Sequence, residues 1–249
     1  MLNNFWFDHK EITNEMSEEK VFLNYLLRFQ NGDFSAKREF VNFFLNTSDW
    51  NIYVLGVRLF MAICSHTDLE KLTMFLNNCD EEQLRVFLAF IPEALTVQVV
   101  PLLLAVYEDW EKTYIGQDIA RCICEMLGAE YHDDTHYDVN ELGNLFISFS
   151  KENDLSLYYY RGRVYFVGDI TKKIISMAVY CRSKSKNFLG DQMPSILSNG
   201  AGIECPVHNN TEINSDTISQ LYRYVNTIIQ EQQLRGKKYF YNHLIVNEE

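Results

Sequence analysis

The fold is decided by one stretch of the sequence, Gly56-Val57-Arg58-Leu59-Phe60-Met61-Ala62-Ile63-Cys64. Two other stretches are similar to it. Arg58–Cys64 aligns with Arg85–Ile91 at an offset of 27 residues, and the whole stretch aligns with Gly116–Cys124 at an offset of 60. Small residues recur at one position of these alignments: Ala62, Ala89 and Cys122. Repeated helical segments stack in solenoid folds, so the pattern predicts helices that pack closely with these small residues buried.

The residues on both sides continue the pattern, and we predict that 17–127 is almost entirely helical. Apolar residues recur every three or four positions, which is helical spacing. Polar residues that favour helix N-termini precede several of these runs. The predicted helices begin at or beside Ser17, Ser35, Asp49, Asp68, Asp80, Leu95 and Thr113. Successive antiparallel pairs of such helices resemble HEAT-like units of an α-solenoid; the alternative is an irregular helical bundle.

The chain after about residue 130 has a different character, and we divide it there into a helical-repeat region, 1–130, and a mixed region, 131–249. The mixed region is predicted to be helical with a short β-hairpin at about 155–167, since aromatic and β-branched runs flank a Gly turn. Residues 183–214 are rich in Ser, Asn and Gly, which predicts a long irregular segment. The aromatic tail Tyr239-Phe240-Tyr241 is expected to pack against the body.

The composition favours a folded, acidic protein. Of 249 residues, 47% are apolar and 22% are charged, which is incompatible with wholesale disorder. The net charge is −12, so binding of nucleic acid through its phosphates is not expected. Residues 1–130 carry 10 basic and 20 acidic side chains, whereas 131–249 carry 12 and 14. The acidity therefore belongs mainly to the predicted repeat region.

Targeting signals are not visible in the sequence. The N-terminus lacks the basic and long apolar stretches of a signal peptide. Charged, polar and proline residues interrupt the most apolar run, Leu84–Tyr107, which therefore predicts buried helices instead of a membrane span. We expect a cytoplasmic protein without membrane contact. Its six cysteines, in a chain of this length, do not suggest a disulfide framework.

Four groups of residues have chemistry that requires weighing. His132 and His136 have the i, i+4 spacing of metal ligands on a helix, but the Glu of the His-Glu-x-x-His motif is absent, so a solvated connector is favoured. Cys205 and His208 bring a thiol near an imidazole, but no further ligand pair accompanies them, and an ordinary cysteine is favoured.

The third group is Ser198–Gly202, whose glycines lack the spacing of a dinucleotide-binding or phosphate-binding loop. Tyrosines and arginines in Tyr158–Tyr165 alternate as in single-strand nucleic-acid binders, but the acidic net charge favours a half-buried hairpin. We therefore predict no catalytic residue, no bound metal and no cofactor.

The repeated segments, together with the acidic first half, resemble the HEAT-like immunity proteins of bacterial polymorphic-toxin and contact-dependent growth inhibition systems. The resemblance implies a stoichiometric toxin inhibitor that binds a cognate, often basic, toxin domain by protein–protein contact. Two alternatives stay open: an enzyme with its site in 183–214, and a HEAT-like adaptor in another assembly.

The predicted partner surface consists of acidic residues at the ends of the repeat helices. Tryptophan surrounded by polar groups is frequent among the residues that contribute most to protein interfaces. The predicted binding residues are Glu81, Glu82, Glu108, Asp109, Trp110, Glu111, Asp133 and Asp134. Salt-sensitive association with a basic partner is expected if they bind.

Overall fold

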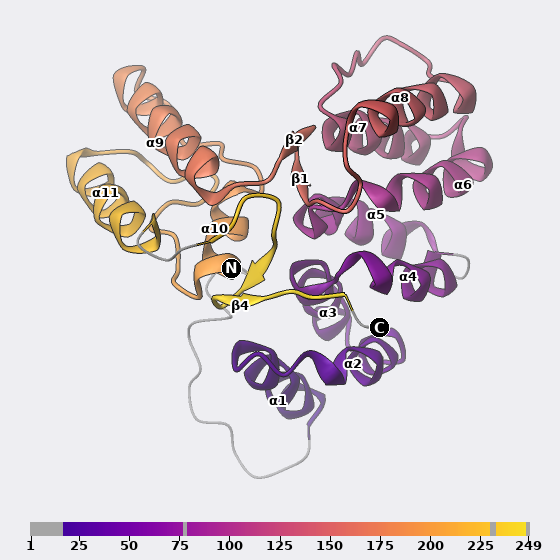
Figure 1. Ribbon diagram of the computed structural model, residues 1–249, viewed down its shortest axis with the longest axis horizontal. Coiled ribbons are helices and arrows are strands. Elements are labelled where there is room, and N and C mark those ends of the chain that lie inside the picture. Colours follow the sequence, from indigo (N-terminus) through magenta and orange to yellow (C-terminus); the bar gives the residue numbers. More distant parts are fainter. Residues whose placement is uncertain (1–16, 77–78, 230–232, 248–249) are drawn as a thin grey trace. The chain divides into compact units, whose positions relative to one another are not determined.

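A computed structural model describes residues 17–76, 79–229 and 233–247 and shows a mainly helical protein (Figure 1). The chain folds into two compact units. Unit 1 combines Met1–Ala36 with Phe166–Leu244, and unit 2 consists of Lys37–Tyr165 with Ile245–Glu249. These units divide the chain differently from the sequence-based boundary at residue 130, which stays a prediction.

Unit 2 contains most of the helices. Its elements are α2 (Lys37–Leu45), α3 (Trp50–Ile63), η3 (His66–Asp68), α4 (Leu69–Leu76), α5 (Glu81–Phe90), η4 (Ile91–Ala94), η5 (Val97–Val99), α6 (Val100–Trp110), α7 (Tyr114–Leu127), α8 (Val139–Glu152), β1 (Tyr159–Tyr160) and β2 (Arg163–Val164). Helices α3, α5 and α7 contact one another in succession, α2 packs on α3, and α6 and α8 pack on α7. No helix among the described residues is both long and apolar enough to cross a membrane.

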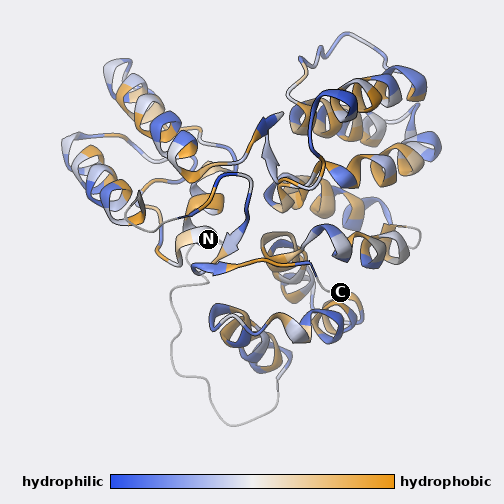
Figure 2. Ribbon diagram, viewed as in Figure 1, coloured by the Kyte–Doolittle hydropathy of each residue, from blue (hydrophilic) through white to orange (hydrophobic). Residues whose placement is uncertain are grey.

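The centre of unit 2 is α3, most of whose residues are buried. Figure 2 shows its apolar character. Gly56 allows α3 to approach α2 closely, because a Cβ at this position would lie 2.4 Å from the Cβ of Phe44. Gly116 in α7 has an equivalent role, since its Cβ would lie 2.4 Å from the carbonyl oxygen of Trp110. The alignment at an offset of 60 residues therefore relates two helices that each pack closely on the preceding one.

The prediction of helices over 17–127 is confirmed for the described residues 17–76 and 79–127, which contain no strand. Ala62 and Cys122 are buried, as expected. Ala89 is exposed, so the prediction was wrong at this position. The buried face of α5 contains Leu84, Phe87 and Leu88, and a residue at position 89 points away from it. The alignment at an offset of 27 residues therefore pairs similar residue types, but aligned residues do not lie on corresponding buried faces of the two helices.

The N-caps explain several of the helix starts. Asp49 accepts hydrogen bonds from the backbone N–H groups of Asn51 and Ile52, at 2.8 and 3.3 Å. Asp80 and Gln83 form a reciprocal capping box at the start of α5. Ser17 precedes α1 without a side-chain cap bond, and Ser35 lies inside a short 3₁₀ helix instead of before a helix.

Unit 1 contains α1 (Glu18–Gln30), η2 (Phe34–Ala36), α9 (Val167–Ser183), α10 (Met193–Ala201), α11 (Ser215–Ile229), β3 (Tyr239–Phe240) and β4 (His243–Leu244). Helices α9 and α11 lie side by side, and α10 contacts α9 and β3. The prediction that 183–214 is irregular throughout was wrong, because α10 lies within it. Its first turn contains Pro194, and Gly202 ends it in the left-handed conformation.

Two antiparallel hairpins complete the fold. In the first, Tyr159 pairs with Val164 and Tyr160 with Arg163, as predicted for 155–167. The second pairs Tyr239 with Leu244, and its buried Phe240 confirms that the aromatic tail packs against the body.

Candidate functional site

The predicted acidic residues lie in unit 2 at the ends of α5, α6 and the connector before α8. Glu81 and Glu82 are exposed in the first turn of α5, where negative charge is compatible with the helix dipole. Glu108 and Asp109 are exposed on the last turn of α6, and Trp110 and Glu111 are half-buried beside them. Asp133 and Asp134 are exposed in the connector.

A chain of ion pairs links α5, α7 and the connector, and we call it the charged ladder. Arg85 contacts Glu81 at 3.0 Å and Asp118 at 3.2 Å. Arg121 contacts Asp118 at 3.5 Å and Asp133 at 3.0 Å. The ladder shows that the predicted residues Glu81 and Asp133 lie on one face of unit 2. Exposed pairs of this kind contribute roughly 0–1 kcal/mol each, so the ladder's main effect is to orient charge.

The turn between α6 and α7 is held by its own hydrogen bonds. The carbonyl of Trp110 accepts from the backbone N–H and the hydroxyl of Thr113, at 2.9 and 2.7 Å. The Thr113 hydroxyl in turn accepts from the N–H of Gly116. Tyr114 follows with 79% of its surface exposed. This turn therefore presents a tryptophan and a tyrosine, in fixed backbone positions, next to Glu108, Asp109 and Glu111.

The connector is also held by side-chain contacts. Tyr131 stacks on Tyr137 with ring centroids 5.5 Å apart, and the Arg121 guanidinium lies 5.1 Å from the Tyr131 ring centroid. His136 Nε2 lies 3.7 Å from a carboxylate oxygen of Glu111. These contacts bring the connector beside both α7 and the end of α6.

His132 and His136 are exposed connector residues, as the sequence favoured. In 17–76, 79–229 and 233–247, no group of three or more His, Cys, Asp or Glu side chains is arranged to hold a metal ion.

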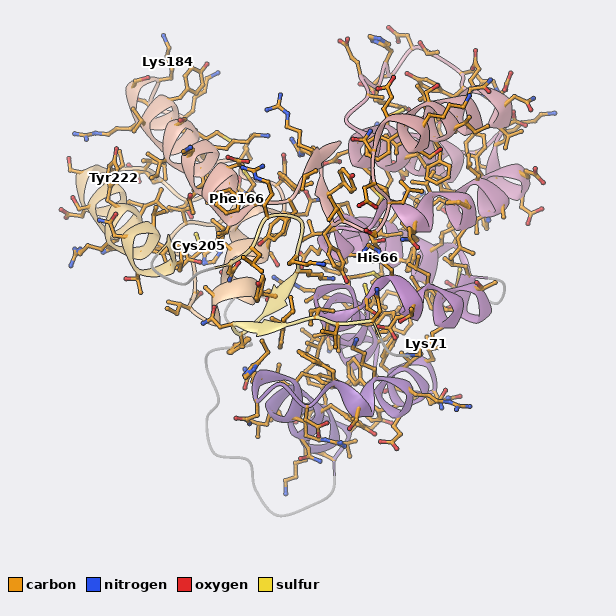
Figure 3. The ribbon with its side chains drawn as sticks, viewed as in Figure 1. His66, Lys71, Phe166, Lys184, Cys205 and Tyr222 are labelled. Atoms are coloured by element: carbon orange, nitrogen blue, oxygen red, sulfur yellow. The ribbon has the colours of Figure 1, made fainter. Side chains whose placement is uncertain are left out.

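Cys205 does not have the properties of a catalytic nucleophile. Its side chain is buried, and burial raises the pKa of the thiol to about 12, whereas reactive cysteines have lowered values. His208 Nε2 instead lies 3.3 Å from Glu204. Residues Ser198–Gly202 form the end of α10 and its C-cap, so they are not a phosphate-binding loop. Figure 3 labels Cys205 within unit 1.

The first hairpin is half-buried, the arrangement that the sequence favoured over nucleic-acid binding. Tyr158, Tyr159 and Tyr165 are buried. The guanidinium of Arg161 lies 2.7 Å from Glu125 of α7, so this cation is already paired.

Two buried ion pairs in unit 2 were not predicted from the sequence. Lys37 Nζ lies 2.9 Å from a carboxylate oxygen of Asp68, with side chains 1% and 0% exposed. Asp68 also accepts from the backbone N–H and hydroxyl of Ser65, each at 2.8 Å, and contacts Lys71. Arg58 and Glu93, both buried, lie 4.0 Å apart.

His66 connects Thr96 with the segment before β1. Its Nδ1 lies 2.7 Å from the Thr96 hydroxyl, and its Nε2 lies 3.2 Å from the carbonyl oxygen of Ser156. Since a carbonyl only accepts, Nε2 donates to Ser156, and in the neutral imidazole Nδ1 then accepts from the Thr96 hydroxyl. The ring also stacks on Tyr158 at 4.3 Å. The partners lie 30 and 90 residues away, and no local pattern in the sequence indicates them. Figure 3 labels His66 and Lys71 in this unit.

Comparison with known proteins gives one family. A family model described as Immunity protein 47 matches residues 9–245. No curated protein and no solved structure matches the chain. The match confirms the resemblance to immunity proteins and extends it from the first half to nearly the whole chain.

Proposed function

The chain belongs to the Immunity protein 47 family, and from this premise we propose that it neutralises a cognate toxin domain by binding it. The partner is then a protein, and the inhibitor acts by contact, without a reaction of its own. Delivery of the toxin by contact-dependent growth inhibition or a related polymorphic-toxin system fits this role. All six cysteines are free thiols, which suits a cytoplasmic inhibitor in a reducing compartment.

We propose that the toxin binds the acidic edge of unit 2, which consists of Glu81, Glu82, Glu108, Asp109, Trp110, Glu111, Asp133 and Asp134. Residues 37–165 contain 20 acidic and 10 basic side chains, whereas the two segments of unit 1, 1–36 and 166–244, together contain 12 of each. A basic toxin surface is therefore attracted to unit 2. The observation that supports this surface best is the charged ladder, which joins Glu81 to Asp133.

The carboxylates and the aromatic residues of the acidic edge contribute to toxin binding in different ways. Exposed carboxylates accelerate the encounter with a basic partner and contribute less to the final affinity. Trp110 and Tyr114 offer apolar contact area in the middle of these charges, and aromatic side chains of this kind contribute a large share of interface energy.

We also propose that α2–α8 form a short HEAT-like stack. The successive contacts of α3, α5 and α7 support this arrangement, because a solenoid repeats the contact between equivalent helices. The closely packed Gly56 and Gly116 support a repeat of 60 residues.

The test is association kinetics with the cognate toxin domain. The variant reverses four edge charges: Glu81→Lys, Glu82→Lys, Glu108→Lys and Asp109→Lys. We expect association to slow by at least about tenfold at low salt, with a flatter salt dependence. The matched control reverses four exposed acids elsewhere: Glu19→Lys, Glu152→Lys, Glu212→Lys and Asp216→Lys. Unchanged kinetics for the folded edge variant, or equal slowing by the control, would reject the surface.

Trp110→Ala separates an interface role from a core role. If the ring contacts the toxin, dissociation accelerates while the urea midpoint of the free protein stays near that of the wild type. If Trp110 only fills the core, the midpoint falls and dissociation from the toxin is unchanged.

A further inference from the structure

Residues 170–190 differ from the rest of this acidic chain. They contain five basic side chains and no acidic one, although the whole chain has a net charge of −12. The five are Lys172, Lys173, Arg182, Lys184 and Lys186. The segment comprises most of α9 and the loop that follows it, and it lies in unit 1, outside the acidic edge of unit 2.

Helix α9 and the loop after it present these cations to solvent. Its buried stripe contains Ile170, Ile174, Ala178 and Cys181, which pack within unit 1 where α9 contacts α10 and α11. All five basic side chains are exposed. Figure 3 labels Lys184 at the end of α9. Three of the cations, Arg182, Lys184 and Lys186, lie at or just after the C-terminus of α9. Positive charge is favourable there because it complements the helix dipole.

Exposed apolar side chains accompany the cations. Val179 is 46% exposed, Tyr180 is 54% exposed, and Leu189 is 61% exposed. Leu189 follows Phe188, which is buried and whose backbone bonds with Thr211 and Asn210 at 3.0 and 2.7 Å. The loop is thus anchored while Leu189 points outward. Folding leaves three large apolar side chains in water beside the basic end of α9.

We propose that this basic and apolar end of α9 docks onto the surface of an anionic lipid bilayer. Lysine and arginine are attracted to anionic headgroups, and tyrosine is favoured at the membrane–water interface. Val179 and Leu189 gain by entering the boundary between headgroups and acyl chains, whereas the phosphate backbone of a nucleic acid offers them no apolar partner. The acids nearest in sequence, Asp169 and Asp191, flank the segment, and Glu212 lies opposite Asn187 in an isolated bridge. These three acids reduce the charge of the segment without reversing it.

This docking is peripheral, and it differs from the expectation of no membrane contact. The hydropathy of a sequence reveals only apolar stretches long enough to span a membrane. A helix that lies on the membrane surface does not need such a stretch. The proposal is independent of toxin binding, since it concerns a different unit of the chain.

The test is co-sedimentation of the full chain with two kinds of vesicle, phosphatidylcholine alone and phosphatidylcholine mixed with phosphatidylglycerol. We expect binding to the anionic vesicles only, weakened by salt. Arg182→Glu, Lys184→Glu and Lys186→Glu together should reduce the affinity by about a hundredfold, since each basic residue near an anionic surface contributes roughly a factor of five.

Two further variants separate the contribution of this patch from general charge effects. The matched control reverses three exposed cations of unit 2, Lys112→Glu, Lys151→Glu and Arg163→Glu, and should bind as the wild type does. Val179→Ser with Leu189→Ser should weaken vesicle binding several-fold with the charge unchanged. No binding of the wild type to anionic vesicles at low salt, or equal loss in the control, overturns the proposal. Binding of a single-stranded RNA in preference to the vesicles, unaffected by the serine substitutions, would overturn it in favour of nucleic acid.

Discussion

Lys37→Met should destabilise unit 2 strongly at neutral pH, because it removes one partner of a buried ion pair. The lysine and Asp68 are nearly inaccessible to water and lie 2.9 Å apart. Removing one member of such a pair typically costs roughly 3–5 kcal/mol. Asp68 keeps its bonds with Ser65 and its contact with Lys71, so we expect a loss of about 3 kcal/mol, at the lower end of that range.

The pH dependence gives this prediction a second test. Burial opposes ionisation of Asp68, but Lys37, Lys71 and Ser65 outweigh it and lower the pKa of its carboxyl from 3.8 to about 2. The folded state therefore holds the proton less tightly than the unfolded state, and ionised Asp68 stabilises the fold by about 2 kcal/mol. That contribution is complete above about pH 4 and is lost as the pH falls toward about 2.

The assay is urea unfolding followed by circular dichroism at neutral pH and at successively lower pH. The difference between the wild type and Lys37→Met should be largest at neutral pH and should shrink as the solution becomes acidic. Lys151→Met, at an exposed position of α8, serves as the control and should change stability by less than about 0.5 kcal/mol. A loss below about 1 kcal/mol for Lys37→Met, or a difference that does not vary with pH, would refute the reasoning.

Three other substitutions or reactions test local parts of the structure. Asp80→Ala removes the capping box with Gln83 and should lower the free energy of unfolding by about 1 kcal/mol, measured as a shift of the urea midpoint; no shift would contradict the cap. Gly116→Ala would place a Cβ 2.4 Å from the Trp110 carbonyl oxygen, so it should cost about 1–3 kcal/mol and lower the melting temperature. Cys205 should react with a thiol reagent at about pH 8 roughly a thousandfold more slowly than an unfolded cysteine, because its pKa is about 12; rapid modification of the folded protein would revive the enzyme alternative.

The sequence predicted the helices of unit 2 well, because their periodicity and caps are local. It failed where a residue's environment depends on distant elements. Arg58 and Arg85 occupy equivalent positions in the alignment, yet Arg58 is buried near Glu93 and Arg85 is exposed in the charged ladder. Asp68 was expected only as a helix start, and its burial against Lys37 comes from α2.

The two hairpins show the same limit. The first turns through Gly162, and the glycine turn was predicted from the sequence. Its φ is 72°, a conformation that glycine adopts readily. The second turns through Tyr241 and Asn242, both at positive φ, without a glycine. Asparagine tolerates this conformation, whereas tyrosine rarely adopts it. The backbone N–H of Tyr241 donates to the carbonyl of Asn199 at 2.7 Å, and its ring lies near Gly202, so the contacts of this turn are not local.

For the partner surface, the sequence indicated the acidic residues but not the arginines that connect them. Arg85 lies four residues after Glu81, and Arg121 three residues after Asp118, spacings at which charges meet on one helix. These two ion pairs could therefore have been predicted from the sequence. The pairing of Arg85 with Asp118 joins two different helices, and no sequence spacing indicates it.

Unit 1 is built from the first described helix and the last third of the chain, and this determines when it can form during translation. A Cβ on Gly32, just after α1, would lie 2.7 Å from the ring of His243, so these segments are in contact although more than two hundred residues separate them. At roughly 5–20 residues per second, the ribosome needs about 10–40 s to make that interval. The segment just after α1 must wait that long for its contact with His243. A nascent chain of this protein therefore has a period in which chaperones can bind this segment, and a stop codon before His243 would leave it permanently without that contact.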